Sequence, residues 1–143
     1  MLAQRSFLYM SNSEIIRSLK PFFEKKQEVL LAFLFGSFAG RRPRTSSDVD
    51  IGILFGAVPN WYRIHDLAEV LSSLLRKEID LVVLNDASPV LKMQVLKKGL
   101  LLYARNKKQL HQFFVETVNQ YDDLKRIRKN CEDSILRGRI YAG

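Results

Sequence analysis

Three aspartates in the sequence have the type and spacing of ligands for a divalent cation. Asp48 and Asp50 are separated by one residue at the start of an apolar segment, DVDIGILF. Side chains alternate along a strand, so the two carboxylates would point to the same side, about 7 Å apart. Such oxygens can hold Mg²⁺ together with phosphate oxygens and water. Asp80 begins a second apolar segment, IDLVVL, and we expect it to join the cluster if the two strands are neighbours.

A glycine and a serine precede the aspartate pair and could hold phosphate groups. Gly36-Ser37 directly follows an apolar segment, and ten residues separate this pair from Asp48. Glycine lets the main chain approach a phosphate closely, and hydroxyl and N–H groups can donate hydrogen bonds to its oxygens. The intervening loop carries three arginines that could neutralise the charge of a triphosphate, namely Arg41, Arg42 and Arg44.

Each of these features also has an ordinary structural explanation. An Asp-x-Asp sequence is common, and a lone Gly-Ser pair is usually a turn. Asp80 alone could be a solvated residue at the start of a strand, and each loop arginine could be a solvated charge. The combination of Gly-Ser, Asp-x-Asp and a third aspartate, each next to an apolar strand, is much more specific and favours the metal site.

Apolar periodicity predicts the elements that must position these residues. Continuous apolar runs predict buried strands at 29–35, 48–55, 79–84 and 100–103. Helical spacing predicts helices at about 11–23, 61–77, 89–98 and 107–136, with a kink or a new start at Pro21. Because only residues 36–47 join the first two strands, we expect them to pair antiparallel. The fold class is therefore α+β with a mixed sheet.

Composition indicates a soluble protein with anionic partners. The 143 residues contain 23 Lys and Arg against 15 Asp and Glu, which gives a formal net charge of +8. A basic surface favours nucleotides, nucleic acid or an acidic protein. The single cysteine excludes an internal disulfide, and no segment is apolar and long enough for a signal peptide or a membrane span. We expect a cytoplasmic protein without a membrane partner.

One pattern in the sequence resembles that of a known superfamily, and it consists of Gly36-Ser37, Asp48-Val49-Asp50 and Asp80. The superfamily is that of the nucleotidyltransferases which share their fold with DNA polymerase beta. Within it, the chain resembles the minimal nucleotidyltransferases (MNT proteins). The resemblance implies a nucleotidyltransferase domain at 1–105 with a helical extension at 106–143 packed on it.

The resemblance also implies an activity. Asp48, Asp50 and Asp80 would bind two Mg²⁺ ions, with Asp80 also activating the acceptor. Gly36, Ser37, Arg41 and Arg42 would contact the nucleotide. The reaction implied is transfer of AMP from ATP to a hydroxyl, with tyrosine of a HEPN-type ribonuclease toxin as acceptor and the chain as antitoxin. A non-catalytic toxin-binding antitoxin and an enzyme acting on a small molecule remain alternatives, and direct nucleic-acid binding and a homodimer stay open.

The last predicted helix has two interpretations. Its apolar stripe could pack on the domain's own sheet, with the cluster Lys125, Arg126, Arg128 and Lys129 facing water, or it could be a docking surface for a protein or RNA.

The residues predicted to be structural or at the surface are His65 and His111. Trp61 is expected to pack at a helix start, and Cys131 to lie in a core or an interface.

Overall fold

The computed structural model describes residues 12–36 and 49–139. The helices are α2 (Asn12–Glu24), α3 (Trp61–Leu75), α4 (Pro89–Lys98) and α5 (Lys107–Ser134), and the strands are β1 (Val29–Phe35), β2 (Val49–Phe55), β3 (Ile79–Val83) and β4 (Leu100–Ala104). A 3₁₀ turn, η2 (Leu84–Asp86), follows β3, and a short π-helix, η3 (Ile135–Arg139), ends α5. The element order matches the predicted one.

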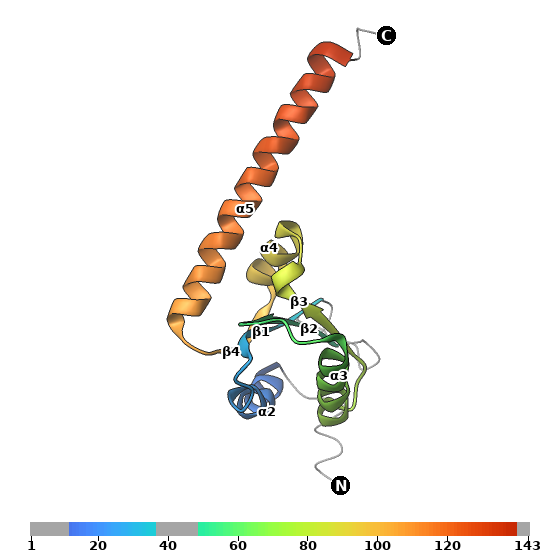
Figure 1. The fold of residues 1–143 in the computed structure, drawn as a ribbon, viewed down its shortest axis with the longest axis vertical. Helices are drawn as coiled ribbons and strands as arrows, with labels where there is room; N and C mark the ends of the chain where they lie inside the picture. Colours follow the sequence, from blue (N-terminus) through green and yellow to red (C-terminus); the bar gives the residue numbers. More distant parts are fainter. Residues whose placement is uncertain (1–11, 37–48, 140–143) are drawn as a thin grey trace.

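The four strands form one mixed sheet in the order β3-β2-β1-β4 (Figure 1). β1 pairs antiparallel with β2 and with β4, whereas β2 and β3 are parallel. The parallel pair requires a crossover connection, which α3 supplies between the two strands. The predicted α+β class with a mixed sheet is therefore confirmed.

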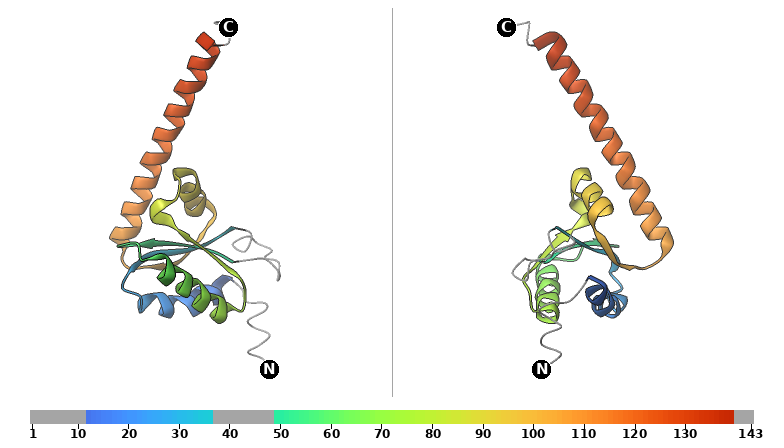
Figure 2. Two further views of the ribbon diagram at one scale, coloured as in Figure 1. Left: turned by 45° about the vertical axis from the view of Figure 1, so that its right-hand side comes forward. Right: turned by 180° about the vertical axis from the view of Figure 1, so that it is seen from behind.

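Helices cover both faces of the sheet (Figures 1 and 2). The α2/α3 core lies on one face and is built around Leu19, Phe23, Ile51, Ile53 and Leu71. The α4/α5 core lies on the other face and consists of Leu31, Phe33, Leu84, Val95 and Phe113. Successive side chains of a strand point to opposite faces, so the same strands contribute side chains to both cores. This explains why β1 and β2 are almost continuously apolar.

Polar side chains fix where the helices begin. Asn60 accepts a hydrogen bond from the Arg63 N–H at 2.9 Å, and Asn106 accepts one from the Gln109 N–H at 2.8 Å. Ser88 caps α4 by accepting a hydrogen bond from the Leu91 N–H, and Pro89 occupies the first helical position. Pro21 lies inside the uninterrupted range of α2, so the helix does not start anew there, although proline supplies no N–H donor for the helical hydrogen bond at that position.

The first half of α5 packs on α4, β1 and β4, and the second half projects beyond the body of the protein (Figures 1 and 2). Phe113 and Thr117 are buried, whereas almost every residue after Leu124 is exposed. Among the described helices, none combines the length and the apolar character needed to cross a bilayer.

Candidate active site

Asp50 and Asp80 lie side by side on neighbouring strands. They are Cα partners in the parallel β2–β3 pairing, and adjacent strands in a sheet are about 4.8 Å apart. In-register partners on parallel strands project to the same face, so the two carboxylates share one side of the sheet. Asp50 is half-buried and Asp80 is exposed. The structure thus brings together two of the three aspartates that the sequence singles out.

The pair belongs to the face covered by α4 and α5. Val49, Ile51 and Ile53 belong to the α2/α3 core, so Asp50 must point the other way. Gly52, two residues along β2, confirms the alternation, because a Cβ on it would lie 3.1 Å from the Leu84 side chain in the α4/α5 core. Any ligand of Asp50 and Asp80 therefore approaches from the α4/α5 side.

Gly36 brings the end of β1 against the Asp50 carboxylate. Its φ of +78° lies in the left-handed region, and it is the only glycine with a positive φ among the described residues. A Cβ at this position would lie 3.0 Å from Asp50 Cγ and closer still to Oδ2. The glycine therefore leaves space for the carboxylate, and any side chain here would displace it.

The chemistry of this donor set fits a hard divalent cation. Two carboxylates directly opposite each other on neighbouring strands repel, and a cation between them removes that cost. Magnesium prefers such oxygen ligands and completes its shell with water and phosphate oxygens. Within 12–36 and 49–139, no three His, Cys, Asp or Glu side chains form a group that could hold a metal ion.

The other predicted site residues lie outside the described residues. These are Ser37, Arg41, Arg42, Arg44 and Asp48. Their assignments, and the metal-binding function of all three aspartates, stay predictions.

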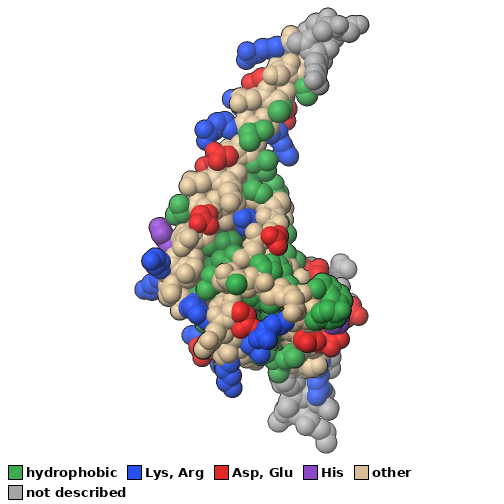
Figure 3. All heavy atoms as spheres, viewed as in Figure 1, with side chains coloured by type: hydrophobic (Ala, Val, Ile, Leu, Met, Phe, Trp, Pro, Cys, Tyr) green, Lys and Arg blue, Asp and Glu red, His purple; other side chains and the backbone are tan. Residues whose placement is uncertain are grey.

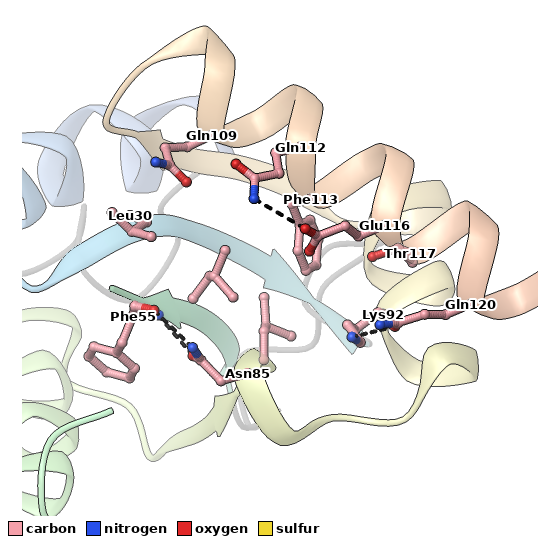
Figure 4. A pocket seen from close by; sticks show the side chains of 12 residues that line it. Leu30, Phe55, Asn85, Lys92, Gln109, Gln112, Phe113, Glu116, Thr117 and Gln120 are labelled. Atoms are coloured by element: carbon pink, nitrogen blue, oxygen red, sulfur yellow. Dashed lines mark hydrogen bonds between the residues drawn. The ribbon is translucent and has the colours of Figure 1, made fainter. Parts of the chain in front are cut away.

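A polar cavity of about 260 Å³ lies between α5 and the carboxyl end of β2, the end away from Asp50 (Figure 4). Asn85 closes one side, since its amide exchanges two hydrogen bonds with the Phe55 main chain, at 2.9 and 2.8 Å. Lys92 donates to Gln120 at 2.7 Å across it. Thr117 lines the cavity with a buried hydroxyl that has no hydrogen-bond partner among the described residues. Sequence reasoning missed this cavity; a threonine within an apolar stripe was its only signal.

Both histidines are exposed at the surface, as predicted. His65 stacks on Trp61 with ring centroids 5.4 Å apart, and His111 lines a groove beside Phe114. Trp61 does begin α3, but it is 69% exposed rather than packed, because α3 turns its other side to the sheet. Cys131 is exposed on the projecting part of α5.

Residues 17–108 match the family model described as polymerase beta, nucleotidyltransferase. This match spans β1 to β4 and includes Gly36, Asp50 and Asp80. The chain therefore belongs to the polymerase beta nucleotidyltransferase family.

Individual members of this family that resemble the chain include an adenylyltransferase and a protein of a toxin–antitoxin complex. The chain is 31% identical over 127 residues to the protein adenylyltransferase MntA of Shewanella oneidensis, covering 89% of this chain and 88% of MntA. A crystal structure of a toxin–antitoxin with AMP-PNP contains a chain 31% identical to this one, with a TM-score of 0.68, covering 88% of this chain and 99% of that chain.

A further solved structure is that of the tri-AMPylated Shewanella oneidensis HEPN toxin in complex with the MNT antitoxin. Its matching chain is 28% identical with a TM-score of 0.65, covering 90% of this chain and 98% of that chain. The sequence-based recognition of an MNT-type nucleotidyltransferase is thus confirmed.

Proposed function

We propose that this chain is an antitoxin that transfers AMP from ATP to a tyrosine hydroxyl of a HEPN-type ribonuclease toxin. The observation that carries the proposal is the in-register Asp50–Asp80 pair beside Gly36, within a nucleotidyltransferase domain. Relatives that match nearly the whole chain include an adenylyltransferase and an antitoxin in complex with an AMPylated toxin.

The proposed reaction is a displacement at the α-phosphorus of ATP. The acceptor oxygen forms a bond to that phosphorus, the bond to the bridging oxygen of the β-phosphate breaks, and pyrophosphate leaves. Asp80, the more exposed carboxylate, accepts the hydroxyl proton. Its position next to Asp50 holds the acceptor on the α4/α5 side of the sheet.

Asp48, Asp50 and Asp80 would hold two Mg²⁺ ions, which supply positive charge that neutralises the phosphates of bound ATP. Gly36 keeps the main chain close enough for its N–H groups to face phosphate, and Ser37 adds a hydroxyl donor. Arg41 and Arg42 offset further negative charge. We assign these functions to residues 1–105 and acceptor binding to residues 106–143.

The test is transfer of label from ATP carrying a labelled α-phosphate to a purified HEPN-type toxin. Asp50→Asn and Asp80→Asn should each reduce transfer by about a hundredfold or more, because a catalytic carboxylate contributes at that level. Asp86→Asn, at an exposed aspartate in η2, is the matched control and should keep full activity. No label on the toxin, despite tight AMP-PNP binding, would contradict the proposal.

Steric neutralisation of the toxin is the second candidate, and the exposed half of α5 favours it as a binding surface. The double variant Asp48→Ala/Asp50→Ala separates the two candidates. If it protects cells from the toxin as fully as the wild type at the same expression level, binding without chemistry is sufficient.

A further inference from the structure

One apolar stripe runs along the whole of α5. In the first half, the stripe residues Leu110, Phe113 and Thr117 pack against α4 and the sheet. Residues seven apart lie on the same side of a helix. The stripe therefore continues beyond the body of the protein, where its members are Leu124, Ile127, Cys131 and Ile135. We call these four residues the α5 stripe.

Three of the four residues of the α5 stripe are exposed, and Leu124 is half-buried. Ile127 is 60% exposed, Ile135 is 45% exposed and Cys131 is exposed. A short helical segment without tertiary contacts is marginal in water, so packing against a partner would stabilise the projecting half of α5. An apolar stripe with polar borders on a protruding helix is typical of a protein–protein interface.

The position of α5 indicates which molecule covers the stripe. Asp50 and Asp80 face the side of the sheet that carries α4 and α5. A protein that delivers a hydroxyl to these carboxylates must approach this side, alongside the projecting helix (Figures 1 and 2). The matched nucleotidyltransferase domain ends at residue 108, so the α5 stripe lies outside it and is available for acceptor recognition.

Basic residues are concentrated on this part of α5, where they are distributed around the helix at about 100° per residue. Lys125, Arg126, Arg128 and Lys129 are exposed and stand within five consecutive residues that contain no carboxylate. Figure 3 shows Lys and Arg side chains along this part of the helix, next to hydrophobic ones. Arg126 has an exposed partner in Asp123 at 3.1 Å, which is a weak surface pair that a stronger partner can replace.

We propose that the α5 stripe is the docking surface for the toxin, which covers it with the apolar face of a helix. This proposal rests on the proposed function and assigns its partner-binding surface. It makes α5 a helix with two functions, since the first half anchors it in the α4/α5 core and the second half holds the acceptor protein.

The test compares two substitutions of equally exposed apolar residues on full-length protein. Ile127→Glu places a charge in the α5 stripe, whereas Leu136→Glu, also at a residue 60% exposed, places the same charge on another side of the helix. Affinity for the same purified HEPN-type toxin is measured by titration calorimetry. AMP-PNP binding and the melting temperature, which should be unchanged in both variants, are measured on the same samples.

We expect Ile127→Glu to weaken toxin binding by at least about tenfold and Leu136→Glu to bind like the wild type. Equal binding by all three proteins overturns the proposal while leaving the adenylyltransferase function intact. If Ile127→Glu instead converts a dimer into a monomer in sedimentation and keeps toxin affinity, a second copy covers the stripe and the proposal is wrong. A wild-type chain that neither binds nor labels the toxin refutes the proposed function itself.

Discussion

At the scale of single residues, Gly36 and Asp50 depend on each other. The left-handed conformation of Gly36 lets the main chain turn directly after β1, and its missing side chain leaves room for the Asp50 carboxylate. A single glycine thus follows β1 directly and leaves space for a proposed metal ligand.

Gly36→Ala should abolish most of the transferase activity while the protein still folds. The added methyl group would lie 3.0 Å from Asp50 Cγ, and alanine at a positive φ costs about 1–2 kcal/mol. We expect AMP transfer to fall by at least about tenfold, because a displaced carboxylate no longer fits the reaction geometry. Gly56→Ala is the control, since its Cβ would meet only Leu30, at an ordinary 3.8 Å. Equal activity of Gly36→Ala and the wild type would contradict this account of Gly36.

At the scale of elements, an ion pair joins the start of β1 to α3. The Arg63 guanidinium donates to Glu28 Oε1 at 2.9 Å, across the turn that follows β2. A hydrogen bond from its own backbone N–H, together with Arg63, holds the pKa of Glu28 below its usual 4.5, although partial burial opposes the shift. The contribution to stability is therefore present above pH 4.5 and is lost as the pH falls through the lowered pKa.

Glu28→Gln should lower the free energy of unfolding at pH 7 by less than about 1 kcal/mol, because Arg63 is largely exposed. The difference from the wild type should shrink in denaturant titrations well below pH 4.5, where Glu28 is protonated in both folded and unfolded chains. Glu132→Gln, at an exposed residue on the projecting part of α5, serves as control. A stability difference that persists or grows in acid would contradict the assignment.

At the scale of the whole molecule, the net charge of +8 should accelerate association with a carboxylate-bearing partner. We expect the association rate constant for the toxin to fall by about tenfold or more when salt rises from about 50 to about 500 mM. Stopped-flow measurements would check this, with AMP-PNP binding monitored in parallel to separate nucleotide effects. A rate constant independent of salt would show that the basic surface does not steer the partner.

Much of this architecture could be predicted from local pattern. The buried strands are long apolar runs and the helices have clear periodicity and caps, so the elements and the mixed sheet follow from the sequence. The pairing of Asp50 with Asp80 required knowing which strands are neighbours, which depends on tertiary packing. The projection of α5 could not be predicted, because its apolar stripe has the same spacing where it is buried and where it is exposed. The cavity around Thr117 depends on how α5 crosses the sheet, which no local pattern encodes.

The parallel register of β2 and β3 has a consequence for how this enzyme can fail. Asp50 and Asp80 are neighbours because Ile51 aligns with Leu81 and Ile53 with Val83, so apolar contacts on the far face decide which acidic groups meet. A slip of one residue would send Asp80 to the opposite face. Substitutions of apolar core residues that pack against α3 should therefore also inactivate the enzyme, even though every polar residue of the proposed site is unchanged.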